Sequence, residues 1–309
     1  MNTKPLLSII IPTKDRGTIF NKTFAAAYKA IENMDAEIII VNDSKTSTVT
    51  IDESHGRITI IDNPKQGVAS ARNLGAKVAN SDLLLFLDDD IIIDEKNLLS
   101  TIELYKNNDN ICYNPNWTYP PELDERIRKT QFGRYLIKLG FTTLQGWNPG
   151  LIWDANKPFE VNLVASYYLP IYKSIFEKIG GYNEDFPHAG AEDHDFAKRL
   201  KASGVKAFIN PSFFVFHNEE DRIGLSDWLK RKERGGETRK IAFELGHTEQ
   251  LIIHNFYKSV IYYAIGKMMG FFKWMLNVIP NNKMFDRIYF RFINMFLAAS
   301  LYKGFRKKS

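Results

Sequence analysis

The sequence predicts an α/β fold with a mostly parallel β-sheet covered by helices on both faces. In residues 1–110, short apolar runs alternate with segments whose apolar residues recur at helical spacing. The apolar runs are nearly continuous in Ile, Leu and Val, which is typical of parallel strands buried on both faces. Polar clusters follow these runs, and open sheets of this kind bind ligands beyond the carboxyl ends of their strands.

The first 110 residues supply most of the expected sheet. We expect strands at residues 6–12, 36–43, 57–62 and 83–88, and helices at residues 18–31, 67–81 and 95–106. The polar clusters after the four strands read TKDR, NDS, NPKQG and DDD. Because parallel strands end at the same edge of a sheet, we expect these clusters to surround one site.

The part that follows is less regular. Its aromatic, Pro- and Asn-rich beginning, residues 112–158, is expected to form long loops and a short helix over the sheet. Order returns with a strand that leads into a helix stopped by a Gly-Gly pair. We expect strand and helix over residues 159–179, a helix over residues 192–203, and a strand, a turn and a second strand over residues 205–217.

The composition is that of an ordinary globular protein, with 44% apolar and 25% charged residues in a chain of 309. The single cysteine, Cys112, excludes an internal disulfide and a cysteine-based metal cluster, and we interpret it as a structural residue. The N-terminal apolar run of about six residues is too short for a signal-peptide core. We interpret it as the first strand of a cytosolic protein.

The charge is divided unevenly along the chain. Residues 222–309 contain 17 Lys or Arg against 6 Asp or Glu, whereas residues 1–221 contain 24 against 30. From residue 250 onward, polar or small residues recur at helical spacing among large apolar ones, which predicts two amphipathic helices. Their aromatic and basic residues favour helices that lie in the surface of an anionic membrane. The alternatives are helices packed in the core or in a homo-oligomer, and a membrane-spanning segment at residues 259–279 that contains two lysines.

The stretch SDLLLFLDDDII places Asp88, Asp89 and Asp90 directly after an expected buried strand. Three adjacent carboxylates repel one another and lose solvation on burial, so we expect a partner outside the chain to compensate them. Mg²⁺ or Mn²⁺ bridging to diphosphate oxygens suits such an oxygen-rich site. A solvated acidic turn is the alternative.

A second acidic cluster lies in GGYNEDFPHAGAEDHDFAKRL, where Glu192 and Asp193 open an expected helix. A carboxylate at that place can cap the helix or act as a general base toward a hydroxyl group. Further along, His217 follows an apolar run. It is either a histidine at the edge of the core or an imidazole ligand beside a carboxylate-bound cation.

Four segments resemble, in order and spacing, the pattern of family 2 glycosyltransferases with the GT-A fold. They are IIIPTKDR, VND, NPKQGVASARNLGAKVANSDLLLFLDDD and IGGYNEDFPHAGAEDHDFAKRLKASG, within residues 6–217. The resemblance implies a metal-dependent, inverting glycosyltransferase that uses a nucleotide-sugar donor. The Gln-x-x-Arg-Trp motif of processive synthases is absent from the sequence, which implies single additions.

The resemblance also implies roles for individual residues. Asp193 matches the catalytic base, with Glu192 helping to place the acceptor. Asp90 and His217 match ligands of Mn²⁺ or Mg²⁺, together with Asp88 on the ribose or sugar side. The residues implied to bind the donor are Pro12, Thr13, Asp15, Arg16, Asp43, Gln66, Gly67, Arg72, Asp88 and Asp89.

The resemblance also implies the type of donor and the domain organisation. Asp43 is expected to accept from a pyrimidine ring N–H, which favours a UDP- or dTDP-linked donor; the family often has a second acid where this chain has Asn42. The GT-A catalytic domain is expected at residues 1–221, and a basic, helical extension at residues 222–309. Within the catalytic domain, we expect the nucleotide-binding half at residues 1–110 and the acceptor and catalytic half at residues 111–221.

The expected partners are a nucleotide-sugar donor, a glycan or lipid-linked acceptor, and an anionic membrane surface bound by residues 251–309. We therefore expect a cytoplasmic protein, peripheral on the inner face of the cell membrane. Nucleic acid is not an expected partner, because lipid buries the apolar residues between the positive charges better than a phosphate backbone does. The alternatives are a nucleotidyltransferase, although PTKDRG is no glycine-rich phosphate loop, and a catalytically silent, membrane-bound sugar-binding protein of the same fold.

Overall fold

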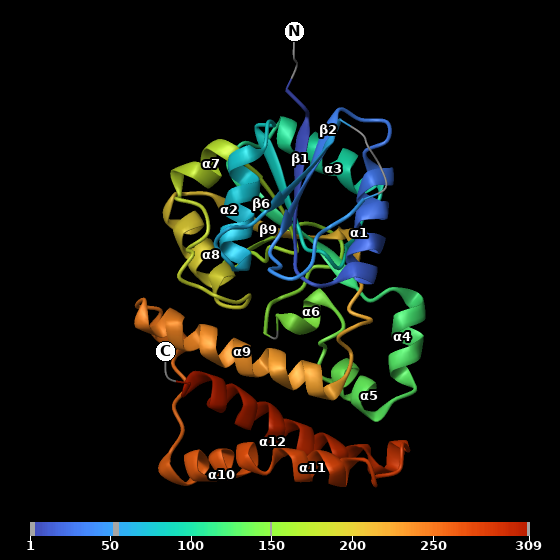
Figure 1. Cartoon of the computed structure of the whole chain (residues 1–309), viewed down its shortest axis with the longest axis vertical. Coiled ribbons are helices and arrows are strands. Elements are labelled where there is room, and N and C mark those ends of the chain that lie inside the picture. The colour runs from blue at the N-terminus through green and yellow to red at the C-terminus, as the bar shows by residue number, and fades with distance from the viewer. Residues whose placement is uncertain (1–3, 52–55, 149, 308–309) are drawn as a thin grey trace. The chain divides into compact units, whose positions relative to one another are not determined.

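The computed structural model describes residues 4–51, 56–148 and 150–307 (Figure 1). The chain divides into two compact units. The first comprises Met1–Tyr119, Gly150–Pro187 and Glu192–Asn218, and the second comprises Pro120–Pro149, His188–Ala191 and Glu219–Ser309. Residues 120–149, which were expected as loops over the sheet, therefore cluster with the C-terminal helices.

A five-stranded sheet is the base of the first unit. Its strands are β1 (Leu7–Thr13), β2 (Ala36–Asn42), β3 (Ile58–Asp62), β4 (Leu83–Leu87) and β8 (Tyr168–Tyr172). They lie in the order β3-β2-β1-β4-β8, and the first four are parallel whereas β8 runs antiparallel to β4. The mostly parallel α/β sheet is thus confirmed. β3 is an edge strand with Ile60 42% exposed, so the expected burial on both faces does not extend to this strand.

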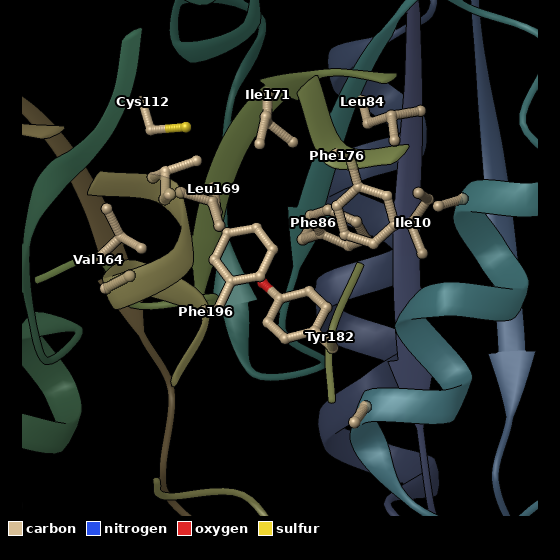
Figure 2. Close-up of a cluster of buried hydrophobic side chains, with 14 of the residues drawn as sticks. Ile10, Leu84, Phe86, Cys112, Val164, Leu169, Ile171, Phe176, Tyr182 and Phe196 are labelled. Carbon is tan, nitrogen blue, oxygen red and sulfur yellow. The ribbon is translucent and has the colours of Figure 1, made fainter. Parts of the chain in front are cut away.

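Helices cover both faces of this sheet (Figure 1). They are α1 (Gly17–Ala30) and α3 (Glu95–Lys106) on one face, and α2 (Val68–Val78), α7 (Lys173–Lys178) and α8 (Glu192–Ala202) on the other. Figure 2 shows the core under the second set, where the Phe86 ring lies 5.0 Å from Phe176 and 5.5 Å from Tyr182 between centroids. Cys112 lies in the same cluster, and burial raises the pKa of its thiol, which suits a structural role.

A second sheet corrects the expectation for two segments. β5 (Ile91–Ile92), β6 (Ile111–Thr118), β7 (Phe159–Val161) and β9 (Lys206–His217) form it, with β9 in the centre. β6 was expected to be loop, because its Asn and Pro residues are poor strand formers; its ladder with β9 overrides that propensity. β9 is one strand rather than two. The expected turn is an irregularity in register next to Pro115, which has no N–H to donate to the ladder.

The second unit is helical. Its helices are α4 (Pro121–Arg128), α5 (Gln131–Lys138), α6 (Leu144–Trp147), α9 (Leu225–Glu244), α10 (Phe256–Lys267), α11 (Met269–Leu276) and α12 (Asp286–Phe305), with 3₁₀ turns η1 (Thr248–Gln250) and η2 (Lys283–Phe285). Tyr135, Trp228 and Phe296 lie in its buried apolar core. The backbones of α9 and α12 come into contact at Gly236. A Cβ on this residue would lie 2.2 Å from the Leu301 carbonyl oxygen, so only glycine fits there.

The two expected amphipathic segments of this unit form three helices. The first expected segment is divided at Met268 between α10 and α11, and the second corresponds to α12. Lys308 and Ser309, at the end of the expected membrane segment, lie outside the described residues. Within the described part of the chain, no helix combines the length and the apolar character needed to cross a membrane.

The contact of α2 with the sheet leads to a testable prediction for Gly75. A Cβ at Gly75 would lie 2.3 Å from Cγ2 of Ile10 on β1. Gly75→Ala is therefore expected to lower the free energy of unfolding by about 1–2 kcal/mol, because overpacking outweighs the better helix propensity of Ala. Urea unfolding measures the change. Gly17→Ala is the control, since its Cβ would meet no atom within 4 Å; a Gly75 variant as stable as this control would contradict the prediction.

Candidate active site

The ends of β1 and β4 lie side by side at the point where the order of the sheet reverses. The chain runs from β1 outward to β2 and β3, and then returns to β4 on the other side of β1. Sheets of this kind bind ligands in the crevice at such a point. Thr13 and Arg16 follow β1 there, and the three aspartates follow β4.

Arg16 joins these two strand ends. Its Nη1 donates to Asp89 Oδ1 at 2.8 Å and to Asp90 Oδ2 at 2.6 Å, and its side chain is 4% exposed. Thr13 Oγ1 donates to the other oxygen of Asp89 at 2.8 Å. The expectation that a partner outside the chain compensates the aspartates was therefore wrong in part, because a guanidinium of the chain itself neutralises much of their charge.

A second buried guanidinium links the third aspartate to α8. Arg72 donates to Asp88 at 2.8 Å and to Glu192 at 3.2 Å. Burial opposes the charge of Arg72, but Asp88 and the acids of α8 outweigh it and hold the pKa of Arg72 above its usual value. The Asp88 side chain is 34% exposed, more than Asp89 at 10%, so it retains oxygen surface for a ligand. Glu192 is 1% exposed and lies beneath Arg72 rather than at the surface.

Asp193, the predicted base, lies in the first turn of α8 and is fixed by Ser166. Both the backbone N–H and the hydroxyl of Ser166 donate to its carboxylate. Ser166 Oγ is 2.6 Å from the Tyr182 hydroxyl. Since the Ser166 proton goes to Asp193, the Tyr182 hydroxyl is the donor in that contact. Burial raises the pKa of Asp193, and Arg72 and Ser166 act in the opposite direction.

Three residues of this network were missed in the sequence. Ser166 lies in an apolar context that gives no signal, and Tyr182 reads as an ordinary core aromatic. Asn73 directly follows Arg72. Its side-chain amide donates to the Tyr182 carbonyl at 2.9 Å and accepts from the Tyr182 N–H at 2.8 Å, so it anchors the loop before α8. Its place in the family-like segment was the available signal.

His217 lies at the end of β9, next to Asp90. Its Nε2 is 3.3 Å from Asp90 Oδ1, and the Asn218 N–H donates to the Asp90 carbonyl at 2.7 Å. The Trp117 ring packs nearly perpendicular to the imidazole, with 4.7 Å between centroids. A carboxylate oxygen and an imidazole nitrogen in one buried place suit Mn²⁺ or Mg²⁺. The structure thus brings together Asp90 and His217, while Asp88 turns to Arg72.

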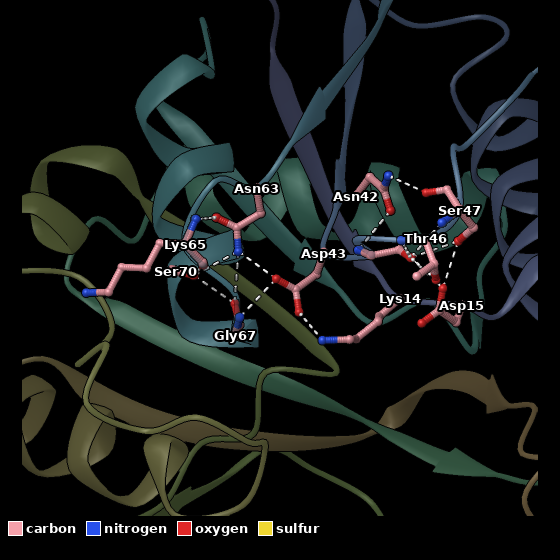
Figure 3. Close-up of polar contacts among 11 residues, drawn as sticks. Lys14, Asp15, Asn42, Asp43, Thr46, Ser47, Asn63, Lys65, Gly67 and Ser70 are labelled. Atoms are coloured by element: carbon pink, nitrogen blue, oxygen red, sulfur yellow. Dashed lines mark hydrogen bonds and ion pairs between the residues drawn. The ribbon is translucent and has the colours of Figure 1, made fainter.

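The ends of β1 and β2 carry a separate polar network (Figure 3). Asp43 accepts from the Gly67 N–H at 2.9 Å, from Asn63 at 2.7 Å and from Lys14 at 3.2 Å. Gly67 has φ of +127°, which favours glycine, and its N–H reaches Asp43 in that conformation.

Two further expected donor residues border this network. Asp15 has φ of +53° and accepts from the hydroxyls of Ser44 and Ser47, which lower its pKa. Gln66 is exposed beside Gly67, and Pro12 is buried at the end of β1. All the expected donor residues therefore lie on segments that follow β1, β2, β3 and β4 or at the ends of these strands.

The fold is that of glycosyltransferases with a GT-A fold. Residues 8–164 match the family model described as glycosyl transferase family 2, and residues 158–219 match the one described as N-terminal domain of galactosyltransferase. The first match covers half of the chain. The protein belongs to glycosyltransferase family 2, as its sequence motifs had indicated.

Several curated proteins are similar to this chain. An uncharacterized glycosyltransferase of Haemophilus influenzae is 29% identical over 71% of either chain. The validoxylamine A glucosyltransferase of Streptomyces hygroscopicus subsp. jinggangensis is 27% identical over 67% of this chain and 54% of its own length. The chondroitin synthase of Pasteurella multocida is 27% identical over 69% of this chain. The match spans a quarter, 25%, of the length of that synthase.

Solved structures confirm the GT-A fold. The mannosyltransferase PcManGT from Pyrobaculum calidifontis, in complex with GDP-Man and Mn²⁺, aligns with a TM-score of 0.58 at 14% identity over 99% of this chain and 89% of its own. GalNAc-T7 with UDP, GalNAc and Mn²⁺ aligns with a TM-score of 0.52 at 16% identity over 70% of this chain and 43% of its own.

The raised pKa of Asp193 predicts how stability depends on pH. A carboxyl whose pKa is higher in the folded than in the unfolded state binds its proton more tightly when folded, so its ionisation costs stability. The unfolding free energy of the wild type, relative to Asp193→Asn, is expected to fall as the pH rises from about 4, the ordinary pKa of Asp. It then levels off above the raised pKa. Urea unfolding over a pH series checks this, and a difference that rises with pH would refute the assignment.

Proposed function

We propose that the protein transfers a sugar, with inversion, from a nucleotide diphosphate sugar to a hydroxyl group of an acceptor. The observation that carries the proposal is Asp193, a carboxylate that Ser166 orients beside the Arg72–Asp88 pair. A base with a raised pKa is suited to accept a proton near neutral pH. Family membership supports sugar transfer over the nucleotidyltransferase alternative.

In the proposed reaction, the acceptor oxygen attacks the anomeric carbon of the donor and loses its proton to Asp193. The bond from the anomeric carbon to the diphosphate oxygen breaks, and its electron pair stays with the diphosphate. One displacement inverts the anomeric centre. Arg72 keeps Asp88 in place and favours the ionised, proton-accepting form of Asp193.

The residues proposed to hold Mn²⁺ or Mg²⁺ are Asp90 and His217. Glu219 is the proposed third ligand, because it is buried and a single residue separates it from His217 in the chain. When bound, the ion would supply charge stabilisation for the diphosphate. Both structural neighbours contain Mn²⁺, which supports this choice.

The donor is proposed to lie along the ends of β1, β2 and β4. Asp43 is the proposed acceptor for a pyrimidine ring N–H, and its contact with the Gly67 N–H supports a fixed orientation of that carboxylate. Pro12, Asp15 and Gln66 are proposed to border the nucleoside. Thr13 and Arg16 are already bonded to the aspartates, so we propose that they position Asp89 and Asp90 rather than contact the base.

The acceptor is proposed to be a glycan or a lipid-linked glycan used in building surface polysaccharide or glycolipid. The likeness to a chondroitin synthase supports a glycan acceptor. Exposed apolar side chains along α10 and α11, interleaved with lysines, support contact with an anionic membrane surface. We therefore propose a peripheral location on the inner face of the cell membrane.

Asp193→Asn tests the proposed base. Because a general base contributes about 10²- to 10⁴-fold, kcat is expected to fall by that range while donor binding persists. Steady-state turnover and equilibrium donor binding measure the two effects. Asp195→Asn is a matched control in the same helix, since Asp195 pairs with Arg199 at 2.6 Å; its kcat is expected to change far less. Equal losses in both variants would remove Asp193 from the role.

A thermal-shift screen of UDP-, GDP- and dTDP-sugars tests donor and metal together. A ligand that binds the folded state raises the melting temperature in proportion to ln(1 + [L]/Kd), so the preferred donor is expected to give the largest shift in the presence of Mn²⁺. EDTA is expected to remove the shift and to abolish transfer. His217→Ala is expected to weaken Mn²⁺ binding measured without donor. Full transfer activity in EDTA would refute the metal assignment.

A further inference from the structure

The second unit contains a pocket whose residues belong to none of the sites above. It has a volume of about 790 Å³ and is lined by residues of α10 and of the C-terminal part of α12. Ligand pockets in proteins have volumes of about 300–1,000 Å³. The pocket is therefore large enough to receive a ligand.

The lining of this pocket is positively charged. Lys267, Lys303 and Arg306 line it, and no carboxylate does so among the described residues. Lys303 is paired with Glu233 at 2.9 Å, whereas neither Lys267 nor Arg306 forms an ion pair with a described carboxylate. Arg306 donates to the Tyr302 hydroxyl at 2.9 Å, which leaves other guanidinium donors for a ligand. The pocket thus contains two basic side chains, Lys267 and Arg306, whose charge an anionic ligand could neutralise.

Aromatic side chains line the pocket, and further exposed apolar side chains lie on α11 of the same unit. Phe256 is 76% exposed and Tyr263 63% exposed at the pocket, and Trp274 is 62% exposed further along on α11. A free phosphate ion would leave these side chains in water, whereas the acyl chains of a lipid would cover them. Exposed apolar and aromatic side chains near basic residues are typical of contact with an anionic membrane.

We propose that this pocket binds the phosphate head group of an anionic membrane lipid. Lys267 and Arg306 contact the phosphate, and Phe256 and Tyr263 lie at the level where the acyl chains begin. Arg is suited to this role because its planar guanidinium donates two parallel hydrogen bonds to phosphate oxygens. The inference deepens the membrane part of the proposed function, from a charged surface to a defined site, and it does not depend on sugar transfer.

Gly266 offers a test that leaves every charge in place. It lines the pocket, and a Cβ there would meet no atom within 4 Å, so Gly266→Leu is expected to place its side chain in open space within the pocket. Leucine is also the better helix former, so the variant is expected to fold. Gly270→Leu is the matched control, since Gly270 also has open space and does not line the pocket.

The measurement is flotation of the full chain with vesicles of phosphatidylcholine, alone or mixed with phosphatidylglycerol. Gly266→Leu is expected to weaken binding to the anionic vesicles about tenfold or more, because losing the phosphate contacts removes charge-assisted hydrogen bonds. Gly270→Leu is expected to bind like the wild type. Equal binding of the two variants overturns the proposal.

Two charge variants distinguish the pocket from a diffuse positive surface. Lys267→Ala with Arg306→Ala removes two charges from the pocket, and Lys258→Ala with Lys283→Ala removes two exposed charges elsewhere in the same unit. The first pair is expected to weaken binding to anionic vesicles about tenfold or more, and the second much less. Equal losses of vesicle binding in the two double variants would show a diffuse effect of surface charge and overturn the proposal of a binding pocket.

A competition experiment distinguishes a site for lipid phosphate from a site for free phosphate ions. Inorganic phosphate is expected to release the wild type from vesicles no better than chloride at equal ionic strength. Release by phosphate alone would show a site for the free ion and overturn the lipid assignment. Because no donor or Mn²⁺ is used, the result is independent of sugar transfer, and an inactive Asp193→Asn protein that still binds vesicles leaves the lipid site in place.

Discussion

One buried guanidinium, that of Arg16, is the interaction on which the candidate site depends. It comes from the residue before α1 and binds carboxylates at the end of β4, so it joins the two strands at the reversal point of the sheet. An uncompensated buried charge costs about 3–5 kcal/mol when its partner is removed. Asp89 and Asp90 can therefore stay buried side by side because Arg16 is there. Arg72 has the same role for Asp88 and Glu192.

The same arrangement connects the apolar core to the chemistry. Tyr182 stacks on Phe196 at 4.4 Å between centroids, and its hydroxyl donates to Ser166, which in turn fixes Asp193. Burial raises the pKa of Tyr182, so its hydroxyl stays protonated and remains a donor. The orientation of the proposed base therefore depends on how the aromatic rings of the core pack.

The second unit shows how close helix packing leaves an apolar surface uncovered. A Cβ on Gly304 would lie 1.8 Å from the Glu233 carbonyl oxygen, so α12 packs directly on the backbone of α9. Ile293 and Phe296 are buried in that core, whereas Phe271 and Trp274 on α11 point outward. Amphipathic periodicity in the sequence predicted helices of this kind, but periodicity cannot say which of two apolar faces finds a partner within the chain.

The sequence by itself determined the alternation of buried strands and helices and the family, and it predicted candidate site residues, because these depend on local pattern and motif spacing. It could not show that Arg16 compensates the aspartates, that Ser166 holds Asp193, or that β6 is a strand, since each involves partners far apart in the chain. Asp90 and His217 are 127 positions apart and meet at 3.3 Å. Only the tertiary structure decides such meetings, because packing of the whole sheet brings the strand ends to one place.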